Sequence, residues 1–147
     1  MLLSNKYLIF PLVVSALILG GLSSSNASND IWYLQLNKST LNPPGYVFGI
    51  VWPILYLLMA ASAYRTFPRT INLFYLQLFF NAIWSWLFFA FQLPLIALLC
   101  IWLLIFLNIK VNIDMYKYDK FAGYLYIPYI IWLLFASYLN LYIVLNN

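Results

Sequence analysis

Side chains that perform acid–base or metal chemistry are nearly absent from this sequence. Its 147 residues include three Asp and seven Lys or Arg, but no Glu and no His, and Cys100 is the one cysteine. General acids and bases are mostly His, Glu or Asp, and tetrahedral metal sites mostly use Cys and His. The composition therefore argues against a hydrolase or metalloenzyme and predicts no metal site, and one cysteine excludes an intramolecular disulfide.

Aromatic side chains are the groups that could bind a ligand. They make up 21% of the residues, and Phe48, Trp52 and Tyr56 follow one another at intervals of four, so they share one face of a helix. The tryptophans inside long apolar runs are Trp52, Trp84, Trp86, Trp102 and Trp132. An indole N–H in hydrocarbon needs a partner, so several of these should face a bundle interior or a ligand. Packing alone is the alternative.

Two amides also lie inside apolar runs. Asn81 comes one turn after Gln77 and just before Trp84, and Asn140 lies in the last run. A buried amide in a membrane must be hydrogen-bonded, which leaves two interpretations for each residue. It either joins helices, a contact worth about 0.6–2 kcal/mol, or contacts a ligand.

The elements that must position these side chains are membrane helices. The chain is 66% hydrophobic and 7% charged, with a mean hydropathy of +0.91, whereas soluble domains carry about 25% charged residues. Five apolar runs of about the length that spans a bilayer predict helices at residues 6–22, 46–64, 71–91, 93–113 and 121–145. The runs show no alternation, which argues against strands. The predicted fold is an all-α integral membrane protein, a single five-helix domain over residues 1–147.

The first run has two interpretations. Lys6 precedes it and the small polar segment 23–28 follows it, as in a cleaved signal peptide. Its length also suits a retained membrane helix. These residues alone leave both interpretations open.

The charges predict an orientation. If all five runs span, one side carries Lys6, Arg65, Arg69, Lys110, Lys117 and Lys120, and the other carries Lys38 alone. Because basic loops stay inside, we expect the N-terminus inside, the C-terminus outside and the loop of residues 23–45 outside. The net charge of +4 is spread thinly over loops, which indicates orientation in a membrane and no nucleic-acid partner.

Prolines mark the ends and interiors of the predicted helices. Pro43 and Pro44 push the preceding residues out of the helical region, so the second helix should begin at about Gly45. Pro53 and Pro128 fall inside the second and fifth runs, where each should kink or open its helix. Such kinks would either widen a cavity or adjust packing.

Four motifs along the chain carry a family resemblance. They are Trp32-Tyr33-x-x-Leu36-x-Lys38, Asn42-Pro43-Pro44-Gly45-Tyr46-Val47-Phe48-Gly49-x-Val51-Trp52-x-x-Leu55-Tyr56, Gln77-x-x-x-Asn81-x-x-Trp84-x-x-x-Phe88-Phe89 and Pro128-Tyr129-x-x-Trp132-x-x-Phe135-Ala136-x-x-Leu139-Asn140. In order and spacing they resemble the translocator protein family. Its bacterial members are called tryptophan-rich sensory proteins, and its mammalian members were known as peripheral benzodiazepine receptors.

The resemblance implies a five-helix bundle in a bacterial cell membrane, with the first run retained and no cleaved signal peptide. A ligand cavity would lie at one end beneath a lid formed by residues 23–45. The family binds porphyrins such as protoporphyrin IX, and some members bind cholesterol, isoquinoline carboxamides or benzodiazepines. By matched position the lining would be Trp52, Asn81, Trp84, Trp132 and Ala136, with Phe48, Tyr56, Phe88 and Phe135 as neighbours and Tyr33, Pro43 and Pro44 in the lid. No cofactor is required, and porphyrin is the expected ligand.

The chain also departs from the family pattern. Ser39 stands where the family often has Pro, Tyr46 and Ile50 replace a common Trp and Pro, and Cys100 replaces an acidic residue. The C-terminal cholesterol pattern lacks its basic residue, because Tyr142 is followed by Ile143-Val144-Leu145-Asn146-Asn147. A match by spacing at Val111, Tyr116 and Lys120 is a weak pattern. We therefore predict no dedicated sterol site.

Three classes of function are open at this point. The first is a membrane receptor, sensor or carrier for porphyrins, metal-free because no His can serve as an axial ligand. The alternative is light- and oxygen-dependent porphyrin degradation with Trp52 and Trp132 as the reactive indoles. A transport or structural role without tetrapyrroles is disfavoured, because no polar stripe crosses the runs. Small residues at Ala16, Gly20 and positions 60–63 are compatible with a homodimer.

Overall fold

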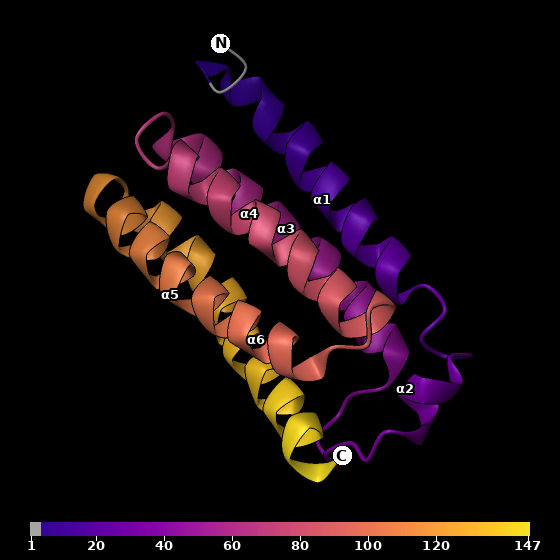
Figure 1. The fold of residues 1–147 in the computed structure, drawn as a ribbon. Helices are drawn as coiled ribbons and strands as arrows, with labels where there is room; N and C mark the ends of the chain where they lie inside the picture. The colour runs from indigo at the N-terminus through magenta and orange to yellow at the C-terminus, as the bar shows by residue number, and fades with distance from the viewer. Residues whose placement is uncertain (1–3) are drawn as a thin grey trace.

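The computed structural model describes residues 4–147, which form one elongated helical bundle (Figure 1). Its elements are the 3₁₀ turn η2 (Lys6–Leu8), α1 (Ile9–Ser24), α2 (Ile31–Gln35), α3 (Gly45–Thr66), α4 (Ile71–Ser85), the π-helical turn η3 (Trp86–Ala90), α5 (Pro94–Tyr118) and α6 (Lys120–Asn146). No strand occurs within residues 4–147, so the predicted all-α fold is confirmed. The predicted single domain also included residues 1–3, which lie outside the described residues.

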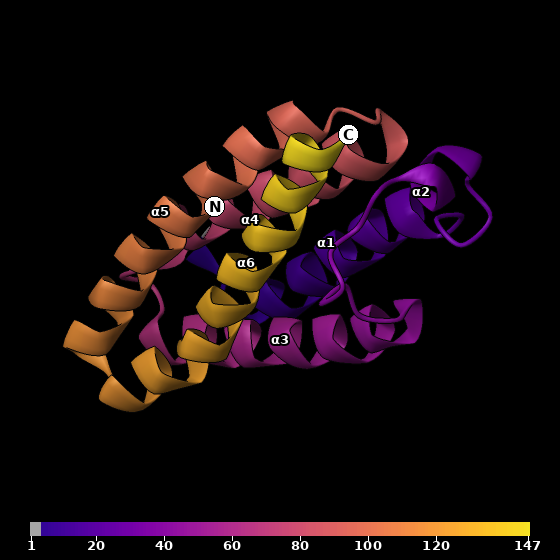
Figure 2. The ribbon, with the colours of Figure 1, turned by 90° about the horizontal axis from the view of Figure 1, so that it is seen from below.

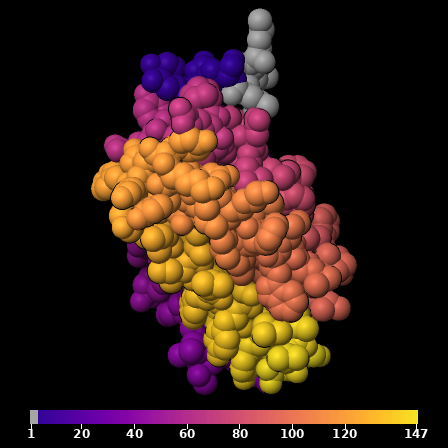
Figure 3. All heavy atoms as spheres, turned by 90° about the vertical axis from the view of Figure 1, so that its left-hand side faces the viewer, coloured from indigo at the N-terminus to yellow at the C-terminus, as the bar shows by residue number. Residues whose placement is uncertain are grey.

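Five helical segments are long and apolar enough to cross a membrane. They are Lys6–Ser24, Gly45–Thr66, Ile71–Ala90, Pro94–Tyr118 and Lys120–Asn146. Their outer faces keep large apolar side chains exposed, among them Leu57, Phe79, Phe106 and Ile131, each more than 60% exposed. Such apolar surface is unfavourable in water and suits lipid. Figure 3 shows one outer face of the bundle, formed mostly by α5 and α6.

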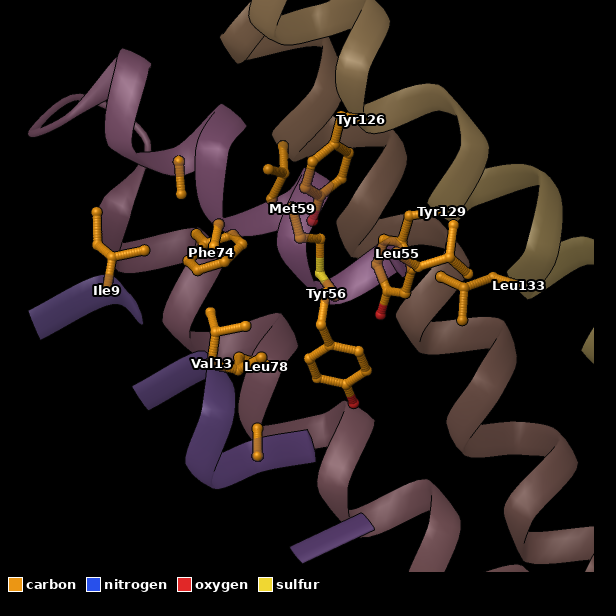
Figure 4. Close-up of a cluster of buried hydrophobic side chains, with 14 of the residues drawn as sticks. Ile9, Val13, Leu55, Tyr56, Met59, Phe74, Leu78, Tyr126, Tyr129 and Leu133 are labelled. Carbon is orange, nitrogen blue, oxygen red and sulfur yellow. The ribbon is translucent and has the colours of Figure 1, made fainter. Parts of the chain in front are cut away.

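A closely packed core fills the half of the bundle nearest the start of α1 (Figure 4). Ile9 of α1, Met59 of α3, Phe74 of α4 and Tyr126 of α6 are fully buried there. Spans that are consecutive in the chain run in opposite directions (Figure 1), so the second half of α3 meets the first halves of α1, α4 and α6 at this level. The first half of α3 is left to face the other end of the bundle.

The first span is part of the bundle. Val13 and Ala16 of α1 are buried, and α1 packs against both α3 and α4. Because its inner face is covered by these helices, α1 contributes to the core in the way that the retained-helix interpretation expects.

The helices differ from the predicted runs by more than two residues at one end, and one short helix was not predicted. The fourth helix continues to Tyr118, five residues beyond the predicted end at 113, because hydropathy reports the hydrocarbon boundary and a helix can extend past it. The loop expected at residues 23–45 contains the short helix α2, whose first turn is capped by Asp30 Oδ1 accepting from Trp32 N at 2.9 Å. Helices α3 and α6 continue through Pro53 and Pro128, and the kinks expected there stay a prediction.

Candidate ligand-binding site

A cavity of about 990 Å³ lies at the end of the bundle that holds α2 and the C-terminus. Figure 2, seen from that end, shows the segment carrying α2 beside the ends of α1 and α6. The cavity is lined by Leu17, Gly20, Gly21, Ser24, Ser25, Ala27, Ser28, Tyr33, Lys38, Asn42, Pro43, Pro44, Gly45, Tyr46, Phe48, Gly49, Trp52, Pro53, Tyr56, Asn81, Trp84, Ser85, Phe89 and Ala136. Its walls therefore come from α1, α3, α4, η3 and α6, and its cover from residues 25–44.

The first half of α3 forms an aromatic wall. Pro44 is extended, with φ −57° and ψ 150°, and the helix begins at Gly45 as expected. From there Phe48, Trp52 and Tyr56 lie one turn apart and all line the cavity. The Trp52 and Tyr56 ring centroids are 5.8 Å apart in an edge-to-face arrangement, a favourable geometry for an aromatic pair.

Pro53 adds a backbone feature to the same wall. Proline has no N–H, so it cannot donate the helical hydrogen bond to the carbonyl of Gly49 four residues earlier. Both residues line the cavity. The wall thus combines flat aromatic rings with a stretch of backbone that lacks one internal hydrogen bond.

Asn81 lies at the inner end of the cavity and joins three helices. Its side chain accepts a hydrogen bond from the Tyr56 hydroxyl of α3 and donates one to the Tyr129 hydroxyl of α6. Tyr129 in turn donates to Gln77 Oε1 at 3.1 Å. Asn81 is 4% exposed, so this network supplies the partners that a buried amide requires.

Trp84 forms the wall opposite α3 and is fixed by a second network. Its Nε1–H donates to Asn140 Oδ1 at 3.2 Å, and Asn140 Nδ2 donates to the Pro94 carbonyl at 2.9 Å. The chain of bonds connects α4, α6 and α5. Asn140 does not line the cavity, so of the two interpretations of this amide the contacts favour the interhelical one.

Trp132 stands behind the α3 wall. Its ring packs edge-to-face on Trp52, with centroids 6.2 Å apart, and on Phe48 at 5.8 Å. Phe135 packs on its other side at 5.5 Å. Trp132 Nε1 is buried and has no hydrogen-bond partner among the described residues. The Trp132 indole packs against Phe48 and Trp52 from behind and does not itself line the cavity.

Residues 25–44 form the lid, and several contacts hold it to the bundle. Asn37 N donates to Asn147 Oδ1 at 2.8 Å, which ties the lid to the end of α6. The ring of Trp32 packs on Phe88 of η3 with centroids 5.9 Å apart. Asp30 Oδ2 accepts from Gln92 Nε2 at 3.4 Å. The cover is thus ordered against α6 and the α4–α5 connection.

Ser39 adds a further contact between the lid and α6. Its hydroxyl lies 2.8 Å from the Tyr138 hydroxyl, and its Oγ accepts from Leu41 N at 3.1 Å. Ser39 is 7% exposed and Tyr138 is 41% exposed, so the pair is buried on the Ser39 side alone. Proline, which the family resemblance leads one to expect here, has no group that could make either bond.

Comparison with known proteins agrees with this arrangement. The sequence model of the TspO/MBR family matches residues 8–145. The chain belongs to the TspO/MBR family.

Individual relatives extend the match over most of the chain. A tryptophan-rich protein TspO of Archaeoglobus fulgidus is 35% identical over 92% of this chain and 93% of its own length. A tryptophan-rich sensory protein of Cereibacter sphaeroides is 33% identical over 76% and 73%. The human translocator protein is 29% identical over 74% and 70%. The family prediction is confirmed, and this TspO/MBR member is a multi-pass membrane protein of a family of sensory and translocator proteins.

The structure brings most of the predicted site residues of this TspO/MBR member to the cavity. Those in its lining are Tyr33, Pro43, Pro44, Phe48, Trp52, Tyr56, Asn81, Trp84 and Ala136. Phe88, Trp132 and Phe135 lie outside the lining and contact it through other rings. The family resemblance predicted Phe88 and Phe135 as neighbours of the lining, where they lie, but it predicted Trp132 in the lining, from which Trp52 and Phe48 separate it. Ligand binding by these residues stays a prediction.

Sequence reasoning missed four groups of lining residues. They are the end of α1 with the residues after it, the polar lid residues Lys38 and Asn42, the α3 residues Gly45, Tyr46, Gly49 and Pro53, and Ser85 with Phe89 on α4 and η3. Ser85 Oγ lies 2.5 Å from Ser23 Oγ and donates to the Gly20 carbonyl at 3.1 Å, so these polar groups join α4 to α1. A signal was available for Lys38, which was the one basic residue expected on its side of the membrane.

Metal ligands are not gathered at this site. Within residues 4–147, no group of three or more His, Cys, Asp or Glu side chains could hold a metal ion. Cys100 is half-buried outside the lining, with Sγ 3.6 Å from the Phe80 carbonyl. The cavity offers aromatic rings, neutral hydrogen-bonding groups and one ammonium group.

Proposed function

We propose that this protein is a membrane receptor, acting as a sensor or carrier, for porphyrins of the protoporphyrin IX type. The observation that carries the proposal is the aromatic-walled cavity beneath residues 25–44. Its volume of about 990 Å³ is at the upper end of the range of small-molecule sites, about 300–1,000 Å³. Trp52 and Trp84 offer flat surfaces from α3 and α4, which suit a flat macrocycle.

The proposal requires binding and no chemical reaction. The described part of the chain places no His, Asp or Glu in the lining that could act as a general acid or base. A sequence without His also lacks the most common axial ligand of haem iron. We therefore expect metal-free porphyrin to bind in preference to haem, and no cofactor to be required.

The test is a titration of the purified protein in detergent with protoporphyrin IX, followed by the quenching of tryptophan fluorescence. Trp52→Ala removes a lining ring and should weaken binding roughly 3- to 10-fold, since an aromatic contact contributes about 0.5–1.5 kcal/mol beyond its buried area. Trp102→Ala is the matched control, because Trp102 lies outside the lining and bonds Ser137 Oγ at 2.9 Å. Absence of saturable quenching in the wild-type protein would refute the proposal.

A second candidate function is porphyrin degradation driven by light, with dioxygen as the oxidant. The observation in its favour is that Trp52 lines the cavity and packs on Trp132, with ring centroids 6.2 Å apart. Two adjacent indoles beside an excited macrocycle would be readily oxidised. If the double variant Trp52→Phe, Trp132→Phe bleaches bound porphyrin under light as fast as the wild type, this role is excluded.

Other apolar ligands are a further part of the proposal. Sterols and isoquinoline carboxamides, which the family resemblance suggested, would have to enter the same cavity and displace porphyrin. A competition assay with each class against bound protoporphyrin IX distinguishes them. We expect weaker competition by sterols, because the basic end of the C-terminal sterol pattern is missing.

A homodimer was predicted from small residues in the first two spans, and the structure gives this prediction little support. The small residues that suggested it pack within the chain, since Ala16, Ala60 and Ala63 are buried and Gly20 lines the cavity. They leave little small-residue surface for a second copy. Light scattering in detergent tests the oligomeric state.

A further inference from the structure

Among residues 4–147, Lys38 is the one charged side chain in the lining of the cavity. The other polar members are neutral, such as Asn42, Asn81 and Ser85. No Asp, Glu or Arg side chain of the described residues contributes to the lining. The cavity thus combines apolar aromatic walls with a single positive charge in its lid.

The Lys38 ammonium group is held in place but is not neutralised. Its Nζ lies 4.3 Å from the centroid of the Tyr33 ring, a cation–π contact. Its hydrogen bond to the Leu36 carbonyl is long, at 3.5 Å. Among the described residues, the ion pairs are Arg65–Asp119 and Lys117–Asp114, and neither involves Lys38. An ammonium group has three N–H donors, so Lys38 retains donors for another partner.

The surroundings of Lys38 favour an anion. Burial lowers the pKa of Lys38, because the charged form loses part of its water. Burial also raises the pKa of the Tyr33 hydroxyl beneath it, which hydrogen bonding to Asn42 partly opposes, so Tyr33 stays neutral and cannot pair with the lysine. A carboxylate beside the ammonium group would replace the lost hydration with a charge-assisted hydrogen bond.

We propose that Lys38, held on the ring of Tyr33, binds a carboxylate of the ligand, so that the cavity selects an aromatic acid over the neutral form of the same molecule. The inference rests on the proposed function in that the ligand is taken to occupy the same cavity. The aromatic walls bind the ring system, and Lys38 fixes its acidic edge beneath the lid. The ligand class is therefore an apolar aromatic carboxylic acid.

The test compares two pairs of ligands that differ in the acid group. One pair is protoporphyrin IX and its dimethyl ester, and the other is 1-pyrenebutyrate and 1-pyrenebutanol. Binding is measured in a nonionic detergent, with the partition of each compound into empty micelles subtracted. We expect the wild-type protein to bind each acid about tenfold more tightly than its neutral counterpart, which is the lower end of the contribution of a hydrogen bond to a charged group.

Three variants assign the preference to Lys38. Lys38→Met should lower affinity for the acids to that for the neutral compounds and leave the neutral compounds unchanged. Lys38→Arg keeps the charge and should retain most of the preference. Lys110→Met is the matched control, because it removes the same charge from an exposed position on α5 outside the lining.

The outcomes separate this inference from the proposed function. Equal binding of acid and ester by the wild type, or equal loss of both in Lys38→Met, would overturn the inference while porphyrin binding stands. If neither porphyrin binds but pyrenebutyrate is still preferred in a Lys38-dependent manner, the inference holds and the porphyrin proposal fails. If no compound binds, both are refuted.

Discussion

The side-chain amide of Asn81 both joins helices of the bundle and lines the cavity. Its oxygen and nitrogen are bonded to Tyr56 and Tyr129, and it also lines the cavity. Both partners are buried phenols, so loss of the amide would leave the Tyr56 hydroxyl without its acceptor and the Tyr129 hydroxyl with its bond to Gln77 alone. An amide that lines the cavity is thereby fixed by the helices it joins.

Substitution of Asn81 by Leu should destabilise the empty protein. We expect a loss of about 1–3 kcal/mol in the free energy of unfolding, the cost of leaving buried polar groups unpaired. Thermal unfolding in detergent measures it. Asn72→Leu is the control, because Asn72 is exposed on the same helix. Equal stability of the two variants would show that the network contributes nothing.

The sequence predicted which types of residue form the site better than it predicted which of them line the cavity directly. Phe48, Trp52 and Tyr56 were assigned to one wall by their spacing, and they line the cavity together. Trp132 was placed beside them by the resemblance, but it packs behind Trp52, because which residues of α6 face the cavity depends on how α6 sits against α3. Lys38 was visible only as a charge, since its place in the lining depends on how the lid folds over the bundle.

At the scale of elements, Gly123 sets the distance between α5 and α6. A Cβ added there would lie 2.8 Å from Tyr116 Cβ and 3.0 Å from its Cα, so a helix must shift. Asn112 Nδ2 also donates to the Gly123 carbonyl at 2.8 Å. These contacts make Gly123 a point of close approach between the two helices after the turn.

Gly123→Ala should therefore lower stability by about 1–3 kcal/mol, the usual cost of overpacking. Gly21→Ala is the control, because nothing lies within 4 Å of a Cβ at that position. Unfolding midpoints of the empty proteins measure the difference. An unchanged midpoint for Gly123→Ala would mean that α5 and α6 separate at little cost.

The turn between α5 and α6 predicts a dependence of stability on pH. Asp119 Oδ2 accepts from Arg65 Nε at 2.7 Å, which ties the turn to the end of α3. Desolvation raises the pKa of the Asp119 carboxyl, but hydrogen bonds from the Ala122 and Phe121 N–H groups and the bond and charge of Arg65 outweigh it and hold the pKa below its ordinary value.

A lowered carboxyl pKa stabilises the fold above the unfolded-state pKa of about 4, and this contribution disappears as the pH falls through the lower folded-state pKa. We expect the unfolding temperature to fall between pH 5 and pH 3, and to fall less in Asp119→Asn, which removes the titrating group. Parallel curves for the two proteins would contradict this assignment.

The sequence predicted those helices whose positions are decided by hydrophobicity alone. The five spans correspond to the five apolar runs, because continuous apolar stretches of this length have few alternatives to a membrane helix. The sequence did not predict the extension of α5 to Tyr118 or the short helix α2. Both lie outside the hydrocarbon, where helix ends depend on caps such as Asp119 and Asp30.

As a whole, the molecule has a packed half and a hollow half. Met59, Phe74 and Tyr126 fill the half near the α3–α4 and α5–α6 connections, whereas Trp52 and Trp84 face the cavity at the other end. The basic residues Arg65, Arg69, Lys117 and Lys120 lie beside the packed half. By the charge rule we propose that this end is inside and that the lid is outside.

Cysteine accessibility tests that orientation. In a Cys100→Ser background, Thr40→Cys in the lid should react with an impermeant thiol reagent added outside intact cells, and Lys117→Cys should react only after permeabilisation. Both positions are exposed, so differences in burial do not confound the comparison. The reverse pattern would place the lid inside and refute the assignment.

The π-helical turn η3 is a position where insertion or deletion of one residue would change the helix geometry of family members. Phe91 N donates to the Trp86 carbonyl at 2.9 Å, five residues back, so this turn holds one residue more than an α-helical turn would. Deleting one residue here would restore α-helical geometry and rotate the residues that follow by about 100°. Phe89, which lines the cavity, lies in this turn. Single-residue insertions and deletions at this point should therefore reshape the ligand site during evolution while preserving all five membrane spans.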